Sequence, residues 1–329
     1  SLVSVNEYSL IRGFFGSGIE FDDTVENTTV VVAGYRLFIG DEDGIEFDTN
    51  MRDSTVSFTF NGEIAGVDRD GIGFRSRIDD SDLTILQNER IAGDNYGIDF
   101  EDTVDGSFIR ILENRSILGD RNSGIRFDRS VEQSGINIAE NGRILGEDYG
   151  IEFDGPINGT LVSIEGNRRV VGEDVSGISF RRGVDASAVS ISRNREIRGG
   201  DDGVEFEGIR DSFVEINRNA SITGDAVSGI GVYDDLSGST VDVQGNGQVR
   251  GGESGIVFDA SLDASNVNVM RNGAVRGDNI AGIGFLDEVA DSTVAVNQNF
   301  GIRGGDYGIL VDAVVEDSTF NINNNGGIR

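Results

Sequence analysis

Acidic residues recur in this chain at short turn-like segments, each just before a Gly that is followed by Ile or Val. Carboxylates and turn carbonyls are the oxygen ligands that calcium prefers, so stacked segments of this kind could surround a hard cation. We expect a solvated acidic surface and no cofactor, because Asp favours turns for its own reasons. Calcium at these acidic turns is the alternative. The candidate ligands are Asp41, Asp43, Asp68, Asp70, Glu147, Asp148, Glu173, Asp174, Asp201 and Asp202.

A pair of carboxyl groups also serves as the catalytic residues of most glycoside hydrolases. Such pairs occur here as Asp22/Asp23, Asp41/Asp43, Asp79/Asp80, Asp201/Asp202 and Asp234/Asp235. The chain holds 58 acidic residues, however, so pairs arise by chance, and it has no His and no Cys. All of its basic residues are Arg, so Lys is missing too, and the commonest general bases and nucleophiles are absent. We expect no catalytic residues; a carbohydrate-active β-helix enzyme, lyase-like or hydrolase-like, stays the alternative.

The elements that must position these residues follow from one repeat of 26 or 27 residues. Self-similarity at a fixed period indicates a repeat architecture and takes precedence over local motifs. The Gly that opens each repeat occurs at Gly18, Gly44, Gly71, Gly97, Gly124, Gly150, Gly177, Gly203, Gly229, Gly255, Gly282 and Gly308.

Within a repeat, apolar residues stand one and three positions after this Gly, then at twelve and fourteen, and again at twenty, with one more near seven. Alternation with a period of two is typical of strands with one buried face, and no helical pattern competes. We therefore expect an all-β fold: a parallel β-helix (β-solenoid) of about 12 coils with three strands per coil, right-handed because parallel crossovers prefer that hand. Residues 1–329 should form one domain.

Three columns should stack along such a rod. Phe at position three fills the interior, and Ser or Thr precedes the second strand. Asn at position seventeen should form an internal ladder that satisfies the turn backbone. The Gly at positions zero and twenty-two should supply backbone angles that other residues resist. The Asn column comprises Asn61, Asn88, Asn114, Asn141, Asn167, Asn194, Asn219, Asn246, Asn272, Asn299 and Asn325.

One outward column changes character along the chain. The residue after the apolar position twenty is mostly apolar in the first half and becomes Arg in the second. An outward apolar stripe beside an Arg column is typical of a contact surface, although single exposed apolar residues are common. The predicted interaction surface comprises Ile39, Leu118, Leu145, Val171, Arg198, Arg250, Arg276 and Arg303.

The composition limits the classes of partner that the chain can bind. A net charge of −31 argues against nucleic acid and anionic membrane surfaces. No stretch is long and apolar enough for a transmembrane helix, and no signal peptide opens the chain. The absence of Cys excludes disulfides. We expect partners to be other copies of the chain, side by side or end to end, or a cell-surface glycan or protein.

The unit N-G-x-I-x-G-x-x-x-G-I-x-F-D, as at residues 141–154, resembles the degenerate repeats of Gram-negative autotransporter passengers and related large surface adhesins. This resemblance covers essentially the whole chain. It implies a right-handed β-helix, export to the bacterial cell surface, and a role in adhesion, surface coating or self-association. The function expected from the sequence is thus a non-catalytic, extracellular structural or adhesive protein.

Overall fold

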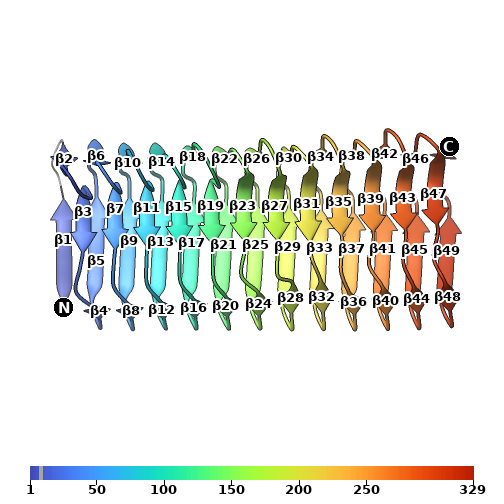
Figure 1. Ribbon diagram of the computed structural model, residues 1–329, viewed down its shortest axis with the longest axis horizontal. Helices are drawn as coiled ribbons and strands as arrows, with labels where there is room; N and C mark the ends of the chain where they lie inside the picture. The colour runs from blue at the N-terminus through green and yellow to red at the C-terminus, as the bar shows by residue number, and fades with distance from the viewer. Residues whose placement is uncertain (7–9) are drawn as a thin grey trace.

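Apolar residues at the strand positions of each repeat meet those of the next repeat and form four stacked parallel sheets. The computed structural model describes residues 1–6 and 10–329 and contains only strands and turns there. Each coil adds one strand to each sheet, and about 12 coils form a β-solenoid (Figure 1). We name the sheets A to D.

Sheets A and B receive the second and third expected strands of each repeat. Sheet A comprises β1 (Leu2–Asn6), β5 (Thr29–Ala33), β9 (Thr55–Thr59), β13 (Asp82–Leu86), β17 (Phe108–Leu112), β21 (Gly135–Ala139), β25 (Leu161–Glu165), β29 (Ala188–Ser192), β33 (Phe213–Asn217), β37 (Thr240–Gln244), β41 (Asn266–Met270), β45 (Thr293–Asn297) and β49 (Thr319–Asn323). Sheet B comprises β2 (Ile11–Arg12), β6 (Leu37–Gly40), β10 (Glu63–Gly66), β14 (Arg90–Gly93), β18 (Ser116–Gly119), β22 (Arg143–Gly146), β26 (Arg169–Gly172), β30 (Ile197–Gly199), β34 (Ser221–Gly224), β38 (Gln248–Gly251), β42 (Ala274–Gly277), β46 (Gly301–Arg303) and β50 (Gly327–Ile328).

Sheet C begins at the repeating Gly, and sheet D follows it. Sheet C comprises β3 (Ile19–Phe21), β7 (Ile45–Phe47), β11 (Ile72–Phe74), β15 (Ile98–Phe100), β19 (Ile125–Phe127), β23 (Tyr149–Phe153), β27 (Ser176–Phe180), β31 (Asp202–Phe206), β35 (Ser228–Val232), β39 (Ser254–Phe258), β43 (Ala281–Phe285) and β47 (Tyr307–Val311). Sheet D comprises β4 (Val25–Glu26), β8 (Met51–Arg52), β12 (Ile78–Asp79), β16 (Val104–Asp105), β20 (Val131–Glu132), β24 (Ile157–Asn158), β28 (Val184–Asp185), β32 (Ile209–Arg210), β36 (Leu236–Ser237), β40 (Leu262–Asp263), β44 (Val289–Ala290) and β48 (Val315–Glu316).

The expectation of three strands per coil is wrong, because the apolar residue near position seven starts a fourth strand. Val25 pairs in register with Met51, and Met51 pairs with Ile78, through parallel two-residue strands. A strand of two residues has one inward and one outward side chain, so it cannot show the alternation by which a strand is recognised in a sequence. Only its pairing with neighbouring coils reveals it. The right-handed winding stays a prediction.

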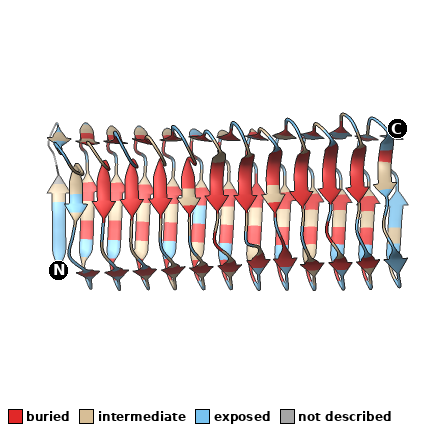
Figure 2. Ribbon diagram, viewed as in Figure 1, coloured by how far each residue is buried: buried red, intermediate tan, exposed pale blue. Residues whose placement is uncertain are grey.

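The sheets enclose one continuous apolar interior. In the view of Figure 1, sheets A and C overlap, while sheet B follows the upper edge and sheet D the lower. The ring of Phe47 in sheet C meets that of Phe58 in sheet A edge-on, with centroids 6.0 Å apart. Figure 2 shows buried residues along all inner strands and exposed ones in the first and last coils. The inward residues of each coil are therefore covered by the coils on either side.

The predicted Phe column is present. Rings stack in sheet C from Phe21 to Phe206 with centroids 4.3 to 5.2 Å apart, and again from Phe258 to Phe285 at 5.1 Å. Val232 interrupts the column between Phe206 and Phe258. Offset aromatic stacking adds to the area that these side chains bury.

The predicted Asn ladder is also present. Asn141 Nδ2 donates to Asn167 Oδ1 at 3.0 Å and to the Ile111 carbonyl at 2.8 Å, while the Asn141 backbone N–H donates to the same Oδ1 at 3.0 Å. The other buried Asn residues repeat this arrangement, and the Ser/Thr column satisfies the next turn in a similar way, as in Ser81 N to Ser107 Oγ at 3.0 Å. Each ladder thus pairs polar groups that a bend would otherwise bury unsatisfied.

The role expected for the repeating Gly is wrong. None of the positive φ angles in the described residues falls on the Gly at position zero or twenty-two. Those Gly residues are needed for space: a Cβ on Gly44 would lie 2.5 Å from the Gly71 carbonyl oxygen. Left-handed angles occur instead directly before the Ser and Asn columns, for example at Asp53 (φ 47°) and Phe60 (φ 57°). Close contact between coils, rather than chain reversal, selects this Gly.

Candidate functional site

The acidic turns with the candidate calcium ligands lie between sheets B and C and split into two classes. Asp43, Asp70 and Asp202, each directly before the repeating Gly, are buried. The others face solvent fully or in part: Asp41, Asp68, Glu147, Asp148, Glu173, Asp174 and Asp201. The structure therefore stacks the backbones of several of these residues, as in Asp68 N to the Asp41 carbonyl at 2.9 Å, but of the ten it buries only Asp43, Asp70 and Asp202.

The buried carboxylates continue the ladder principle on the outside of sheet C. Asp43 Oδ1 accepts the Asp70 N–H at 2.8 Å, and Asp70 Oδ1 accepts the Tyr96 N–H at 3.1 Å. Asp202 Oδ1 accepts the Ser228 N–H at 2.9 Å in the same way. These side chains therefore satisfy the turn backbone of the next coil, as the Asn ladder does inside the rod.

The guanidinium of Arg75 contacts acidic side chains from several of the first coils. Arg75 Nη2 lies 2.6 Å from Asp43 Oδ1, and Arg75 Nη1 lies 2.7 Å from Asp70 Oδ2. The same Nη1 lies 2.5 Å from Glu101 Oε1 and 3.4 Å from Asp99 Oδ2. The Arg75 side chain is only 9% exposed. Charge-assisted contacts of this kind in a buried setting are strong and geometrically specific.

The Arg75 cluster contains more buried carboxyl groups than cations, and this excess shifts the pKa values of its members. Burial, followed by repulsion from Asp99, raises the pKa of Asp70 to about 7. Burial likewise raises the pKa of Asp43 and of Asp99 to about 6, although the Arg neighbours work in the opposite direction. Burial works to lower the pKa of Arg75, but attraction by Asp70 and Asp43 outweighs it, so the pKa of Arg75 rises. The cluster thus holds protons more tightly than free carboxyls do.

Oxygens of Asp70, Asp99 and Glu101 lie within 4.8 Å of one another, a spacing that suits a metal ion. Arg75 Nη1, however, contacts all three of these side chains. Its guanidinium therefore supplies the positive charge expected of calcium. Sequence reasoning missed Arg75, Asp99 and Glu101, because Arg75 lies 32 residues from Asp43. The available signal was that Arg interrupts two columns rich in acidic residues, at Arg75 and Arg181 four positions after the repeating Gly and at Arg126 two positions after it.

The charged network extends along the next coils. Arg126 Nε lies 2.9 Å from Asp99 Oδ1, and its guanidinium lies 4.1 Å from the Tyr96 ring centroid. Ser123 Oγ donates to Glu152 Oε2 at 2.7 Å, and Glu152 Oε1 lies 3.4 Å from Arg181 Nη1. The outer face of sheet C is thus sealed by side chains of both charges.

Asp202 has hydroxyl partners in place of Arg. Ser228 Oγ and Tyr233 Oη donate to Asp202 Oδ1 at 2.5 and 2.8 Å. Burial, opposed by these hydrogen bonds, raises the pKa of Asp202 to about 6. Glu205 Oε2, on the same strand, accepts from Ser176 and Ser179 at 2.8 and 3.0 Å. Asp202 and Glu205 thus form a second group of acidic side chains on this face, bound by hydroxyl donors.

The interaction surface predicted on sheet B forms one column in register. In the parallel strands of sheet B, Arg198 lies beside Thr223, Thr223 beside Arg250, and Arg250 beside Arg276. All four predicted Arg side chains are exposed, whereas Ile39, Leu118 and Leu145 are half-buried and Val171 is buried. The apolar residues in the first half of the column are therefore less exposed to solvent than the sequence predicts. Arg198 pairs with Asp225, and Arg250 and Arg276 both pair with Asp278, so carboxylates relieve the repulsion within the column.

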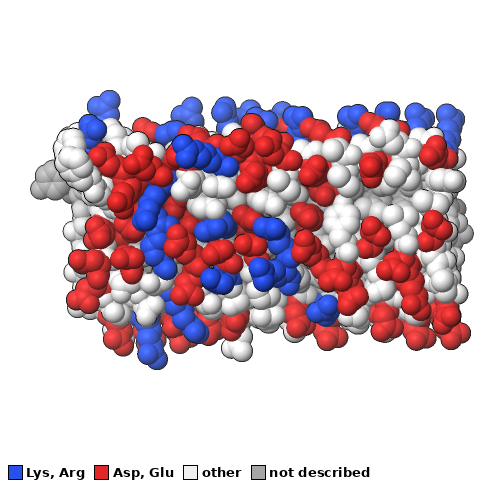
Figure 3. Space-filling model, in the orientation of Figure 1, with Lys and Arg blue, Asp and Glu red and all other residues white. Residues whose placement is uncertain are grey.

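Sheet B and the turns that enter it from sheet A carry an excess of Arg that the sequence analysis did not identify. Between the end of each sheet A strand and the end of the next sheet B strand, from Gly34 onward, lie fourteen Arg and five acidic residues. Figure 3 shows basic side chains along the whole upper edge, where Figure 1 places sheet B. We call these Arg residues the basic stripe. They are Arg36, Arg90, Arg115, Arg143, Arg168, Arg169, Arg193, Arg195, Arg198, Arg218, Arg250, Arg271, Arg276 and Arg303.

Comparison of the chain with protein-family models, with curated proteins and with solved structures found no match in any of the three. Among the described residues there is no helix with the length and apolar character needed to span a membrane.

Proposed function

We propose that this protein is a non-catalytic structural or adhesive rod of the bacterial cell surface that contacts an acidic partner through its basic stripe. The observation that carries the proposal is the continuity of that stripe over successive coils of a chain whose net charge is −31. An acidic chain that gathers half of its Arg on one edge presents a local surface of opposite sign. The partner is a cell-surface glycan or protein, or another copy of the rod.

The uniform winding supports a contact of many weak, repeated interactions. At the end of the sheet B column, Arg250, Arg276 and Arg303 recur once per coil, at about 4.8 Å along the rod. A partner with regularly spaced acidic groups can engage several Arg at once, and such linked contacts raise the overall affinity far above that of one. The resemblance to autotransporter passengers supports the extracellular setting.

The test compares two triple variants with the same charge change. Arg250→Glu, Arg276→Glu and Arg303→Glu reverse the stripe, whereas Arg52→Glu, Arg129→Glu and Arg182→Glu reverse exposed Arg elsewhere. Binding to immobilised heparin, as a sulfated glycan probe, and lateral association of the rods in sedimentation are measured at low and moderate salt. We expect the stripe variant alone to lose binding or association by at least tenfold. Equal losses in both variants, or none in either, would contradict the proposal.

A carbohydrate-active enzyme is the second candidate, and the Asp202 and Glu205 pair is the observation in its favour. A buried carboxyl whose pKa is raised, as that of Asp202 is, beside a second carboxylate is a candidate for acid–base catalysis. A polar hollow of about 260 Å³ opens where the Gly203 repeat is one residue short; Arg182, Glu207 and Asp234 line it, whereas Asp202 and Glu205 do not. Release of reducing ends or unsaturated products from acidic polysaccharides, abolished by Asp202→Asn, would establish this candidate in place of the first.

A further inference from the structure

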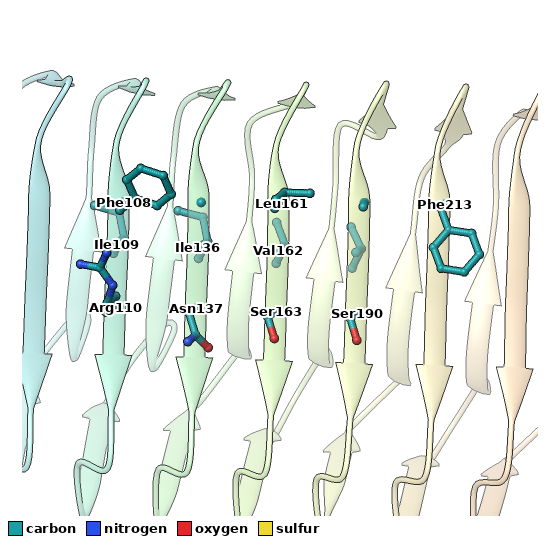
Figure 4. Close-up of a pocket in the computed structure, with 13 residues that line it drawn as sticks. Phe108, Ile109, Arg110, Ile136, Asn137, Leu161, Val162, Ser163, Ser190 and Phe213 are labelled. Carbon is teal, nitrogen blue, oxygen red and sulfur yellow. The ribbon is translucent and has the colours of Figure 1, made fainter.

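Large and small side chains alternate along the outer face of sheet A. Successive strands β17, β21, β25, β29 and β33 carry Phe108, Gly135, Leu161, Ala188 and Phe213 at the same register position. The large members are exposed to 55%, 65% and 43% for Phe108, Leu161 and Phe213. Together they border a shallow apolar hollow of about 520 Å³ (Figure 4).

A polar column runs beside the apolar one. Two residues further along the same strands lie Arg110, Asn137, Ser163, Ser190 and Glu215, and β37 continues the column with Asp242. The column is thus basic at its start, neutral in the middle and acidic at its end. Arg110 and Asp242 lie on strands separated by four others, so they cannot touch each other within one chain.

We propose that this face binds a second copy of the chain, with the two rods antiparallel and a two-fold axis between β25 and β29, parallel to the strands. The proposal does not depend on the basic stripe. An isologous contact of this kind places each strand against its mirror position in the order of the sheet. In this register β25 faces the second copy's β29, β21 faces β33, and β17 faces β37.

The register matches protrusions to hollows. Leu161 meets Ala188 of the second copy, and Phe213 meets the position of Gly135. The Phe108 ring already leans over Gly135, where a Cβ would lie 2.7 Å from the ring. The incoming Phe213 would therefore fill the space between Phe108 and Leu161 and contact the Phe108 ring, an aromatic pair that adds to the buried area. Sliding the second copy by one coil would set Phe108 against Phe213 and leave the hollows facing each other.

The same register matches charge. Arg110 faces Asp242 of the second copy, Asn137 faces Glu215, and Ser163 faces Ser190. The two-fold axis generates each of these contacts twice. No pair of like charges is opposed in the eight strands from β13 to β41. Such complementarity favours another copy of this chain over an unrelated apolar ligand.

The available area is sufficient. Eight coils at about 4.8 Å span about 38 Å, and five-residue strands at about 3.3 Å per residue span about 17 Å. The footprint is then about 650 Å² per copy and about 1,300 Å² in total, above the roughly 1,000 Å² that a specific interface needs. Because each copy carries a net charge of −31, we expect salt to strengthen the dimer.

The test is the oligomeric state of the chain by sedimentation equilibrium at moderate salt. We expect wild type to dimerise and Leu161→Glu to weaken the dimer at least tenfold. The control Phe60→Glu replaces an apolar residue that is similarly exposed (61%) but lies outside this face, and should leave the dimer intact. Arg110→Asp and Asp242→Arg should each weaken the dimer, and their combination in one chain should restore it.

Restoration is specific to the proposed register, since these two residues meet only between copies. A wild type that stays monomeric throughout, a dimer that survives Leu161→Glu, or a double variant that stays as weak as the singles would each overturn the proposal. A stripe variant that loses heparin binding but still dimerises would leave this inference standing, so the two proposals can fail separately.

Discussion

The outer face of sheet C is sealed in two different ways along one rod. In the charged segment, around β7 to β19, the residues on this face include Asp43, Asp70 and Asp99, gathered by Arg75 and Arg126. In the neutral segment, β39 and β43, the same columns hold Ser254 and Val257, then Ala281 and Gly284. All four of these are buried as well.

The comparison shows that the winding does not require the charges. The Asn ladder is the same in both segments, and Phe258 stacks on Phe285 in the neutral one as Phe74 stacks on Phe100 in the charged one. The interior therefore specifies the coil, and the outer face only has to exclude water from the bend between sheets B and C. Small neutral side chains do this without desolvating charge. The charged segment instead depends on its buried ions being paired, which makes it sensitive to substitution and pH. Coils contact only their neighbours, so the two segments can be probed separately.

The largest expected difference follows the loss of Arg75. Arg75→Met would leave Asp43, Asp70 and Asp99 buried without their shared cation, so the charged segment should lose about 3–5 kcal/mol. Arg250→Met, in the neutral segment, removes only an exposed pair with Asp278, worth about 0–1 kcal/mol. Hydrogen exchange resolved by coil measures both. Equal protection losses would show that the cluster contributes no special stability.

A pH titration should separate the segments next. Asp70, with a pKa of about 7, and Asp43 and Asp99, each about 6, bind protons more tightly in the folded protein than in the unfolded chain. The folded state therefore holds more protons between about pH 4 and pH 7, and stability falls as pH rises through that range. At about 1.4 kcal/mol per unit of pKa difference, the rise of the Asp70 pKa from 3.8 to about 7 alone corresponds to about 4 kcal/mol in the charged segment.

The groups that face Asp70 are Asp43, Asp99, Glu101 and Arg75, and Asp70→Asn should remove the largest single share of this pH dependence, while the buried Asp43 and Asp99 keep theirs. Coil-resolved hydrogen exchange at several pH values, corrected for intrinsic rates, measures the effect. If protection in the neutral segment changed with pH to the same extent, the cause would lie outside the Arg75 cluster.

The interior ladder should respond alike in both segments. Asn88→Ala, in the charged segment, and Asn272→Ala, in the neutral one, each remove four side-chain hydrogen bonds to neighbouring coils and leave backbone groups unpaired. We expect a loss of about 1–3 kcal/mol from either substitution. Local protection and thermal unfolding measure it. A loss confined to one segment would show that the two interiors differ.

The smallest expected effect concerns calcium. Arg75 already contacts the oxygens of Asp70, Asp99 and Glu101, so millimolar calcium should leave the protection of the wild-type charged segment unchanged. In Arg75→Met the vacated carboxylates should bind calcium and regain part of the lost protection. A calcium-dependent rise in wild type, reversed by chelator, would instead support calcium binding at the acidic turns.

The sequence alone determined the parallel solenoid, its period and its interior, because Phe, Asn and Ser recur once per coil and like residues must stack. It also identified the outward column on sheet B, because residues at one repeat position stack on each other whatever the shape of the coil in cross-section. It did not determine the fourth sheet, because two-residue strands show no alternation. The inward turn of Asp43 and Asp70 toward Arg75, and the hollow between Phe108 and Phe213, depend on side chains from different coils. Only the stacking distance and the direction of each bend decide which of these meet.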